Sequence, residues 1–353
     1  MRGGNRYGAA SILCGKLAFK LEPLTTIGEK TKMYHYNDLR AERFITTTHV
    51  PCPVKGCSVQ VERQKGRYQK ADAYKCPKHD IYITPAVFEY GNYENNLLCF
   101  DKDDEALLES IFGEKRESRL AREKSEDAVT WNVFRYIEKK DLLKSFLDSI
   151  SSSGNEDARL IYWSFDQNTS EPYAPLVKAR EEFGEKSSKG SEPDLIIEAK
   201  GNIYFVTTKL ESGNKTTPSN PDNKKKYEIG GSNWFSEVFR SGSDFEKVAS
   251  KESFYELMRL WLLGTWIANE HLNRDFFLVN LVLNRKDRDI EYLFGRHINS
   301  NESRAFKRLS WEQIYSLIER IAPVDGKKEI VEYFHGKTLG YINSGILQRA
   351  FSV

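Results

Sequence analysis

The sequence predicts an α/β (α+β) protein whose core runs helix, strand, strand, strand, helix, strand (αβββαβ) around a mixed central sheet. A small metal-binding ribbon precedes this core and a helical segment follows it. Three observations lead to this prediction: a cluster of cysteines with a histidine between residues 52 and 79, two β-rich runs flanking Gly201-Asn202, and the order of helical and strand-like periodicities from residue 119 to residue 283.

Length and composition limit the choices. A chain of 353 residues has room for several domains. We divide it into an N-terminal extension of unknown role (1–48), a ribbon (49–100), the core (104–295) and a C-terminal helical segment packed on the core (296–353). The net charge is only +2, so a nucleic-acid surface would have to come from local basic patches.

The expected compartment is the cytoplasm. No apolar run approaches the length of a membrane span. Lys16 interrupts an apolar run near the start that is too short for a good signal peptide. Three of the five cysteines cluster with a histidine, which favours metal binding in a reducing compartment over disulfides. Cys14 and Cys99 are predicted to be ordinary buried thiols.

Two ligand pairs predict a zinc site. Cys52 and Cys57 flank a Pro- and Gly-containing turn, and Cys76 and His79 flank a second turn after a basic excursion. Three thiolates and one imidazole suit tetrahedral Zn²⁺. We expect a zinc-ribbon or treble-clef fold with strands at residues 81–84 and 87–90. His49 is an alternative ligand, although a surface position suits it better.

Residues 119–150 show a helical spacing of apolar side chains. Glu126 shares the inward face of this pattern with Val133 and Ile137, and a carboxylate on a buried stripe needs a partner or a metal. A glutamate favoured at a helix start by the macrodipole explains the same residue without a site. Asp127 and Glu123 are the alternatives in the same turn.

The third and fourth predicted elements form a hairpin with Gly201-Asn202 as its two-residue loop. This pairing sets Asp194 opposite Lys209 and Ile196 opposite Thr207. Residues that lie opposite each other project to the same face of the hairpin. That face holds Asp194, Ile196, Glu198, Phe205, Thr207 and Lys209. A carboxylate and an ammonium at the open end of a hairpin can bind a divalent metal and polarise a phosphate or its attacking water. An ordinary hairpin with a surface Asp and Lys is the competing interpretation.

The remaining elements complete the order. Residues 159–165 are predicted as a strand, residues 253–268 as a helix, and residues 276–283 as a strand covered on both faces. Residues 212–233 form a long polar loop that either faces DNA or is simply solvated. Ser310 and Gln313 form a capping box at the start of a last helix.

Pro193-Asp194 and Thr207-Thr208-Lys209 together resemble the PD-(D/E)XK nuclease signature. The αβββαβ order is that of the same superfamily. The wider chain, over about residues 50–320, is similar to bacterial restriction-endonuclease-like proteins. In these, a Cys-Pro…His ribbon, a helix like residues 125–134 and a segment like residues 254–259 recur together.

The resemblance implies a Mg²⁺- or Mn²⁺-dependent DNA endonuclease of restriction or defence type. Asp194 would be the bridging metal ligand, Glu126 the outer carboxylate, and Lys209 the residue beside the attacking water. Thr207 departs from the pattern, because it stands where the second acid belongs and a hydroxyl is a weak Mg²⁺ ligand.

A substitute acid would be Asp222 or Glu228. Glu198 is a poorer candidate, since it lies roughly 13 Å along the strand from Asp194. No visible feature fixes the side chain of Asp222 or Glu228, so we expect no compensation, weak metal binding and slow or absent cleavage. Thr207→Glu should then raise cleavage strongly.

Two other function classes remain open. One is a non-catalytic DNA-binding or adaptor protein with a degenerate nuclease fold; the other is a zinc-ribbon protein that recruits another protein. The expected partner is double-stranded DNA, with no membrane and with a homodimer left open. The scattered histidines disfavour an HNH nuclease, and the lack of a Gly-rich loop ending in Gly-Lys-Ser/Thr disfavours a P-loop ATPase.

Overall fold

A computed structural model describes residues 33–114, 119–186, 190–220 and 223–353. These residues belong to one compact unit. Most of the predicted N-terminal extension, including Cys14, lies outside the described residues, and so does Asp222. In the part of the chain that is described, every helix is too short or too polar to cross a bilayer.

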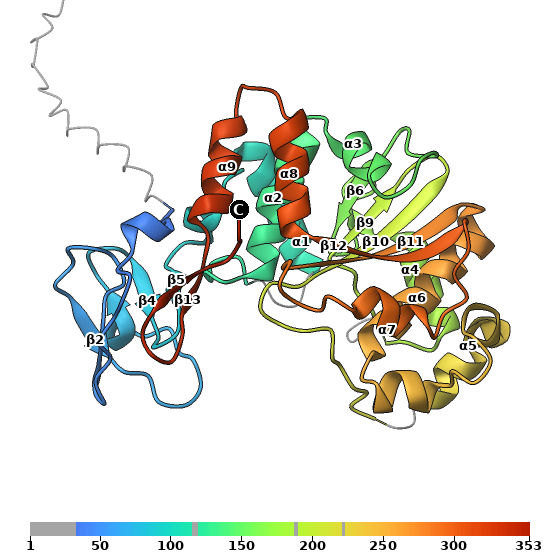
Figure 1. The fold of residues 1–353 in the computed structure, drawn as a ribbon, viewed down its shortest axis with the longest axis horizontal. Helices are drawn as coiled ribbons and strands as arrows, with labels where there is room; N and C mark the ends of the chain where they lie inside the picture. Colours follow the sequence, from blue (N-terminus) through green and yellow to red (C-terminus); the bar gives the residue numbers. More distant parts are fainter. Residues whose placement is uncertain (1–32, 115–118, 187–189, 221–222) are drawn as a thin grey trace, which may run out of the picture. The chain divides into compact units, whose positions relative to one another are not determined.

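A seven-stranded sheet forms the centre of the fold (Figure 1). Its strand order is β12-β11-β10-β9-β6-β7-β8. The strands are β6 (Arg159–Tyr162), β7 (Phe165–Asp166), β8 (Glu171–Pro172), β9 (Leu195–Glu198), β10 (Asn202–Thr208), β11 (Asp275–Val282) and β12 (Arg304–Ser310). β6, β9 and β10 pair antiparallel, whereas β10, β11 and β12 pair parallel. The predicted mixed sheet and the α/β class are therefore confirmed.

Helices cover both faces of this sheet. On one face, Leu195, Ile197, Tyr204 and Val206 pack against α2 (Glu126–Lys139), α3 (Leu143–Asp148) and α8 (Trp311–Ile321). On the other face, Ile196, Ile203 and Phe205 pack against α4 (Ala174–Glu182), α5 (Asn223–Val238) and α6 (Tyr255–Ile267). Each strand alternates its side chains between two apolar layers, which explains why β10 is buried along its whole length.

The predicted helix at 253–268 is α6, and it lies in the crossover between β10 and β11. A parallel pair of strands needs such a crossover. Almost every residue of α6 from Leu257 onward is buried, because the helix is sandwiched between the sheet and the helices α4 and α5. The polar exceptions stand in its first turns, at Glu256 and Arg259.

The helical pattern at residues 119–150 belongs to two helices. Asp141 adopts a left-handed φ of 54° and separates α2 from α3. The polar loop predicted at 212–233 is shorter than expected, since α5 begins at Asn223. Three consecutive left-handed residues, Gly231, Ser232 and Asn233, interrupt α5.

The hairpin register differs from the prediction by two residues. Phe205 pairs with Ile196 and Val206 with Leu195, so Lys200-Gly201 forms the loop. Asn202 does not serve as a turn residue, because its buried side-chain Nδ2 donates to the Ser153 carbonyl (2.6 Å) and to Asn155 Oδ1 (2.8 Å). A shift of two residues keeps every side chain on its predicted face.

The ribbon contains two small sheets. β1 (His49–Pro51) pairs with β2 (Gln60–Glu62), and β3 (Lys75–Cys76), β4 (Ile81–Ile83) and β5 (Phe88–Tyr90) form the second sheet. The two strands predicted at 81–84 and 87–90 are thus present as β4 and β5. Helix α1 (Lys102–Glu114) follows the ribbon.

The segment 296–353 is less helical than predicted. It holds α8 with the expected Ser310–Gln313 capping box, and α9 (Lys327–Gly336). It also supplies β12 to the central sheet, and it ends in a hairpin of β13 (Thr338–Tyr341) and β14 (Leu347–Arg349). Tyr341 and Leu347 of this hairpin enter the core of the ribbon. The short helix α7 (Ile290–Gly295) joins β11 to β12.

Replacing Gly264 tests the packing of α6 on the sheet. A Cβ at Gly264 would lie 2.1 Å from Cζ of Phe276, a side chain that is itself buried. We expect Gly264→Ala to lower the free energy of unfolding by about 1–3 kcal/mol. Gly113, the next-to-last residue of α1, has open space around it, so Gly113→Ala should raise it by up to about 1 kcal/mol. Urea denaturation measures both; equal effects of the two variants would contradict this packing.

Candidate functional site

The carboxylate of Asp194 lies where β9 and β10 begin to pair. Its Oδ2 accepts hydrogen bonds from the Thr208 amide (2.7 Å) and from Thr208 Oγ1 (3.1 Å). Thr130 of α2 in turn donates to Thr208 Oγ1 (2.9 Å). These contacts, which are partly buried at Asp194 and fully buried at Thr130, hold the Asp194 side chain against β10 and, through Thr208, against α2.

The surrounding protein makes Asp194 an unusually weak acid. Burial raises the pKa of Asp194 to about 7, against the opposing effects of the Lys209 ammonium and the Thr208 amide. The carboxylates of Asp127 and Glu256 raise that pKa further, so both lie close enough to repel its charge. Bringing a cation to this carboxylate would relieve an electrostatic cost.

Glu256, in the first turn of α6, supplies an acid that the sequence interpretation missed. Its Oε1 accepts a hydrogen bond from Thr207 Oγ1 (3.1 Å), and its two oxygens lie 2.8 and 3.1 Å from Lys209 Nζ. Its own amide donates to Thr216 Oγ1 (2.8 Å). A carboxylate from a helix therefore contacts both the Thr207 hydroxyl and the Lys209 ammonium.

This finding corrects the expectation that position 207 stands without a nearby acid. Glu228 pairs instead with Lys224 on α5 (3.8 Å). Glu198 is bound by Arg159 (2.6 Å) and Arg274 (2.5 Å) at the other end of β9. Asp222 lies outside the described residues.

Lys209 interacts with the carboxylates of the site. Burial alone would lower the pKa of Lys209, but the Glu256 and Asp194 carboxylates raise it overall, and Glu126 adds to that effect. The side chain is therefore a charged ammonium at neutral pH. Its backbone amide donates to the Leu281 carbonyl (2.8 Å), which continues the pairing with β11 beyond the end of β10.

Glu126 is the first residue of α2, directly after the N-cap Ser125. Its Oε1 accepts hydrogen bonds from the Leu210 amide (2.7 Å) and from Ser212 Oγ (2.5 Å). The side chain therefore reaches the segment that follows Lys209. Glu123, one of the alternatives, points elsewhere and pairs with the buried Lys337 (3.1 Å). Asp127 lines the same hollow as Glu126.

A second buried network holds the chain segment that precedes Asp194. Glu185, whose side chain has no exposed surface, accepts from Arg259 Nε (3.1 Å) and Tyr227 OH (2.7 Å). It also accepts from the amide (2.5 Å) and hydroxyl (2.7 Å) of Ser191. Arg259 lies one turn after Glu256 on α6. The same helix therefore positions Glu256 and, through Glu185, the segment leading into Pro193-Asp194.

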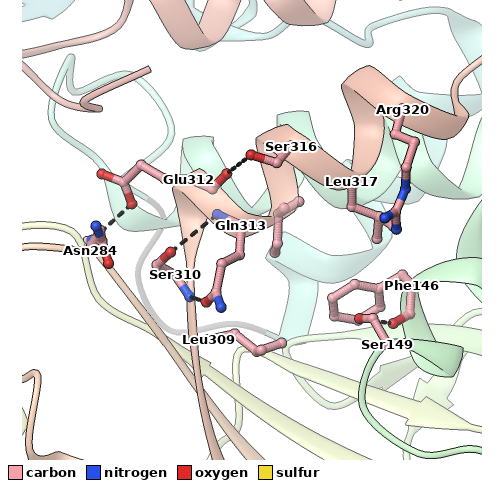
Figure 2. A pocket seen from close by; sticks show the side chains of 11 residues that line it. Phe146, Ser149, Asn284, Leu309, Ser310, Glu312, Gln313, Ser316, Leu317 and Arg320 are labelled. Carbon is pink, nitrogen blue, oxygen red and sulfur yellow. Dashed lines mark hydrogen bonds between the residues drawn. The ribbon is translucent and has the colours of Figure 1, made fainter.

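Two hollows differ in their relation to these residues. One, of about 440 Å³, is lined by Glu126 and Asp127 together with Arg119, Arg122 and Lys124, so it borders the candidate site with basic side chains. Another, of about 410 Å³, lies between α3, β12 and α8 (Figure 2). Its Ser310 and Gln313 cap α8, and Glu312 accepts from the Asn284 amide (2.8 Å). These groups serve the fold, and we assign no chemistry to the second hollow.

The four predicted metal ligands of the ribbon come together. The donor atoms of Cys52, Cys57, Cys76 and His79 all lie within 4.8 Å of one another. His79 Nδ1 is 3.4 Å from Cys52 Sγ and 3.5 Å from Cys76 Sγ, and the sulfurs of Cys57 and Cys76 are 3.9 Å apart. A tetrahedral ion with such ligands spaces the donor atoms by about 3.4–3.8 Å. This buried Cys₃His cluster fits a metal ion such as zinc.

The surroundings act differently on the two kinds of ligand. Burial lowers the pKa of His79, which favours the neutral imidazole that binds a metal, whereas burial raises the pKa of the Cys52 and Cys76 thiols, so a bound metal would have to displace their protons. Gly56 adopts a left-handed φ of 75° in the turn between Cys52 and Cys57. His49 is exposed, with its ring bonded to Thr48 Oγ1 (2.9 Å), so it is not a fifth member.

Comparison with known protein families, curated proteins and solved structures finds no match to this chain. The case for a function therefore rests on the residues and geometry described above.

Proposed function

We propose that the chain is a divalent-metal-dependent endodeoxyribonuclease with a restriction-endonuclease-like PD-(D/E)XK core. The observation that carries the proposal is the contact of Glu256 with both Thr207 and Lys209, beside Asp194. It supports a complete acidic set in spite of the threonine at position 207, with the second acid supplied by α6.

The donor types suit a hard dication, since Asp194, Glu256 and Glu126 offer the carboxylate oxygens that Mg²⁺ and Mn²⁺ prefer. Among the described residues only the Cys₃His cluster already has its donor atoms close enough together for one ion, so cation binding at the acids would have to draw them together. When bound there, such an ion would supply a Lewis acid that neutralises charge on a phosphodiester. Asp194 and Glu256 are oriented by Thr208 and Thr207 respectively, so the oxygens are held before substrate arrives.

Lys209 would act on the substrate directly. Its ammonium stays charged and is held by Glu256 at 2.8 Å. A cation in that position can donate a hydrogen bond to a phosphate oxygen or to the attacking water, and it can stabilise the developing negative charge. The neighbouring hollow also carries Arg119, Arg122 and Lys124. Arg122 is paired with Glu89 (3.3 Å) and Lys124 with Glu211 (2.6 Å), so these cations would have to exchange their carboxylate partners to bind the phosphates of double-stranded DNA, the substrate that we propose.

For the ribbon we propose a structural Zn²⁺ held by Cys52, Cys57, Cys76 and His79. The cluster is closed by four protein ligands, which is typical of structural rather than catalytic zinc sites.

Metal analysis of the purified protein tests the zinc site. We expect about one zinc per chain, lost in Cys76→Ser because a hydroxyl replaces a thiolate ligand. Cys99→Ser is the matched control, since Cys99 lies outside the cluster and should leave the zinc content unchanged. Equal zinc in the two variants, or none in the wild type, would contradict the site.

Plasmid cleavage in Mg²⁺ or Mn²⁺ tests the catalytic set. Asp194→Asn and Lys209→Met should each lower the rate by at least about 100-fold, because each removes a charge that stabilises the transition state. Lys144→Met is the control; this exposed lysine on α3 pairs only locally with Asp148 (2.7 Å). Full cleavage by Asp194→Asn would show that the site is elsewhere. Salt-dependent DNA binding by an uncleaving wild type would favour the non-catalytic alternative.

Moving the acid between helix and strand tests the role of Glu256. We expect Glu256→Gln to lose cleavage by about 100-fold or more, and Thr207→Glu alone to give little gain, because two acids would crowd one place. The double variant Thr207→Glu/Glu256→Thr should recover part of the loss, since the carboxylate then comes from β10. A large gain from Thr207→Glu alone would mean that Glu256 does not compensate.

A further inference from the structure

The ribbon and the start of α2 share a sheet edge. Residues 121–123 run antiparallel to β5: the Tyr90 amide donates to the Ala121 carbonyl (2.9 Å), and the Glu123 amide donates to the Phe88 carbonyl (3.1 Å). Two residues later Ser125 caps α2, and Glu126 follows at once. The position of the candidate metal ligand Glu126 is therefore set by a segment that is hydrogen-bonded to the ribbon.

Glu123 locks this segment from within. Its side chain is fully buried, and Oε1 accepts from the amide (3.2 Å) and hydroxyl (2.9 Å) of Thr338. Oε2 accepts from Lys337 Nζ (3.1 Å) and Tyr90 OH (3.5 Å). Lys337 is also buried and donates to Asn96 Oδ1 (2.8 Å). A buried ion pair with this many partners tolerates only one geometry.

The same contacts lead back to the Cys₃His cluster. Tyr90 OH accepts from the Tyr34 amide (2.9 Å), and the Tyr34 ring stacks on Tyr90 and meets the His79 ring edge-on at 5.8 Å. A continuous set of packed side chains thus joins the cluster to Glu123, three residues before Glu126.

We propose that Glu123 is a positioning residue: by clamping residues 121–123 to the ribbon and to β13, it holds Glu126 against the Leu210 amide and so sets the divalent-cation affinity of the candidate site. The cation-binding part rests on the proposed function; the positioning part does not. Glu126 engages Leu210 through one 2.7 Å bond, and a displacement of about 1 Å in the start of α2 would break it.

The test uses the full-length protein and two readouts. Hydrogen exchange of the Leu210 amide reports whether Glu126 is in place, because that amide donates to Glu126. Electron paramagnetic resonance titration with Mn²⁺ reports the cation affinity. The variant Glu123→Gln/Lys337→Met removes both charges of the clamp together, so neither is left buried alone. Tyr90→Phe removes only one hydroxyl and covers the case in which the double variant does not fold.

The matched control is Asp104→Asn/Arg135→Met, which removes a comparably buried pair (2.7 Å) between α1 and the middle of α2. We expect both clamp variants to speed exchange at Leu210, by at least about tenfold in the double variant, and to weaken Mn²⁺ binding in parallel, with zinc content unchanged. The control should lose stability without either change.

The outcomes separate the two claims. Unchanged exchange and unchanged Mn²⁺ affinity in folded clamp variants would overturn the positioning role and leave Glu123 a stabilising residue only. Faster exchange at Leu210 in a protein that neither binds Mn²⁺ nor cuts DNA would support the positioning and refute the proposed function.

Discussion

The ion pair between Glu256 and Lys209 joins the crossover helix to the end of β10, and the candidate site depends on it. Lys209 follows the strand directly, whereas Glu256 is 47 residues further along the chain. The parallel pairing of β10 with β11 brings them together. Parallel strands need a crossover connection, and α6 in this crossover has its first turn beside the end of β10. The geometry of one contact is thus fixed by the topology of the whole sheet.

Burial on both faces makes that topology firm. The two apolar layers enclose β9, β10 and β11, and α6 contributes its nearly all-apolar surface to one of them. A helix so enclosed cannot rotate without exposing Trp261 or Leu263, so the direction of Glu256 is determined by the core rather than by the site. The polar contacts of Arg259 with Glu185 add a second constraint on the same helix.

The sequence predicted the features that depend on neighbouring residues better than those that depend on contacts between distant parts of the chain. Side-chain periodicity and spacing predicted the faces of the hairpin, the Cys₃His cluster and the capping box, because each depends on residues close together in the chain. The register was wrong by two residues, since it depends on the bonds of Asn202 with residues near 153–155. Periodicity also gave no hint of β13 and β14, whose Tyr341 and Leu347 pack in the core of a ribbon far earlier in the chain.

Glu256 escaped prediction for the same reason. Asp222 and Glu228 follow the strand closely in the sequence, whereas Glu256 lies on α6, further along the chain. A signal was nevertheless present: Glu256 opens a helix whose next residues are almost all apolar, and a lone acid at such a place needs an explanation.

Two of the carboxylates at the candidate site come from the starts of helices. Glu126 and Glu256 both lie in the first turn of a helix, where the macrodipole stabilises a carboxylate. Asp194 has no such support, and burial raises its pKa to about 7. Burial is the main cause of that shift, and the carboxylates of Asp127 and Glu256 add to it. A dication bound as proposed would favour the charged form of Asp194, so the charge of this residue would depend on the metal.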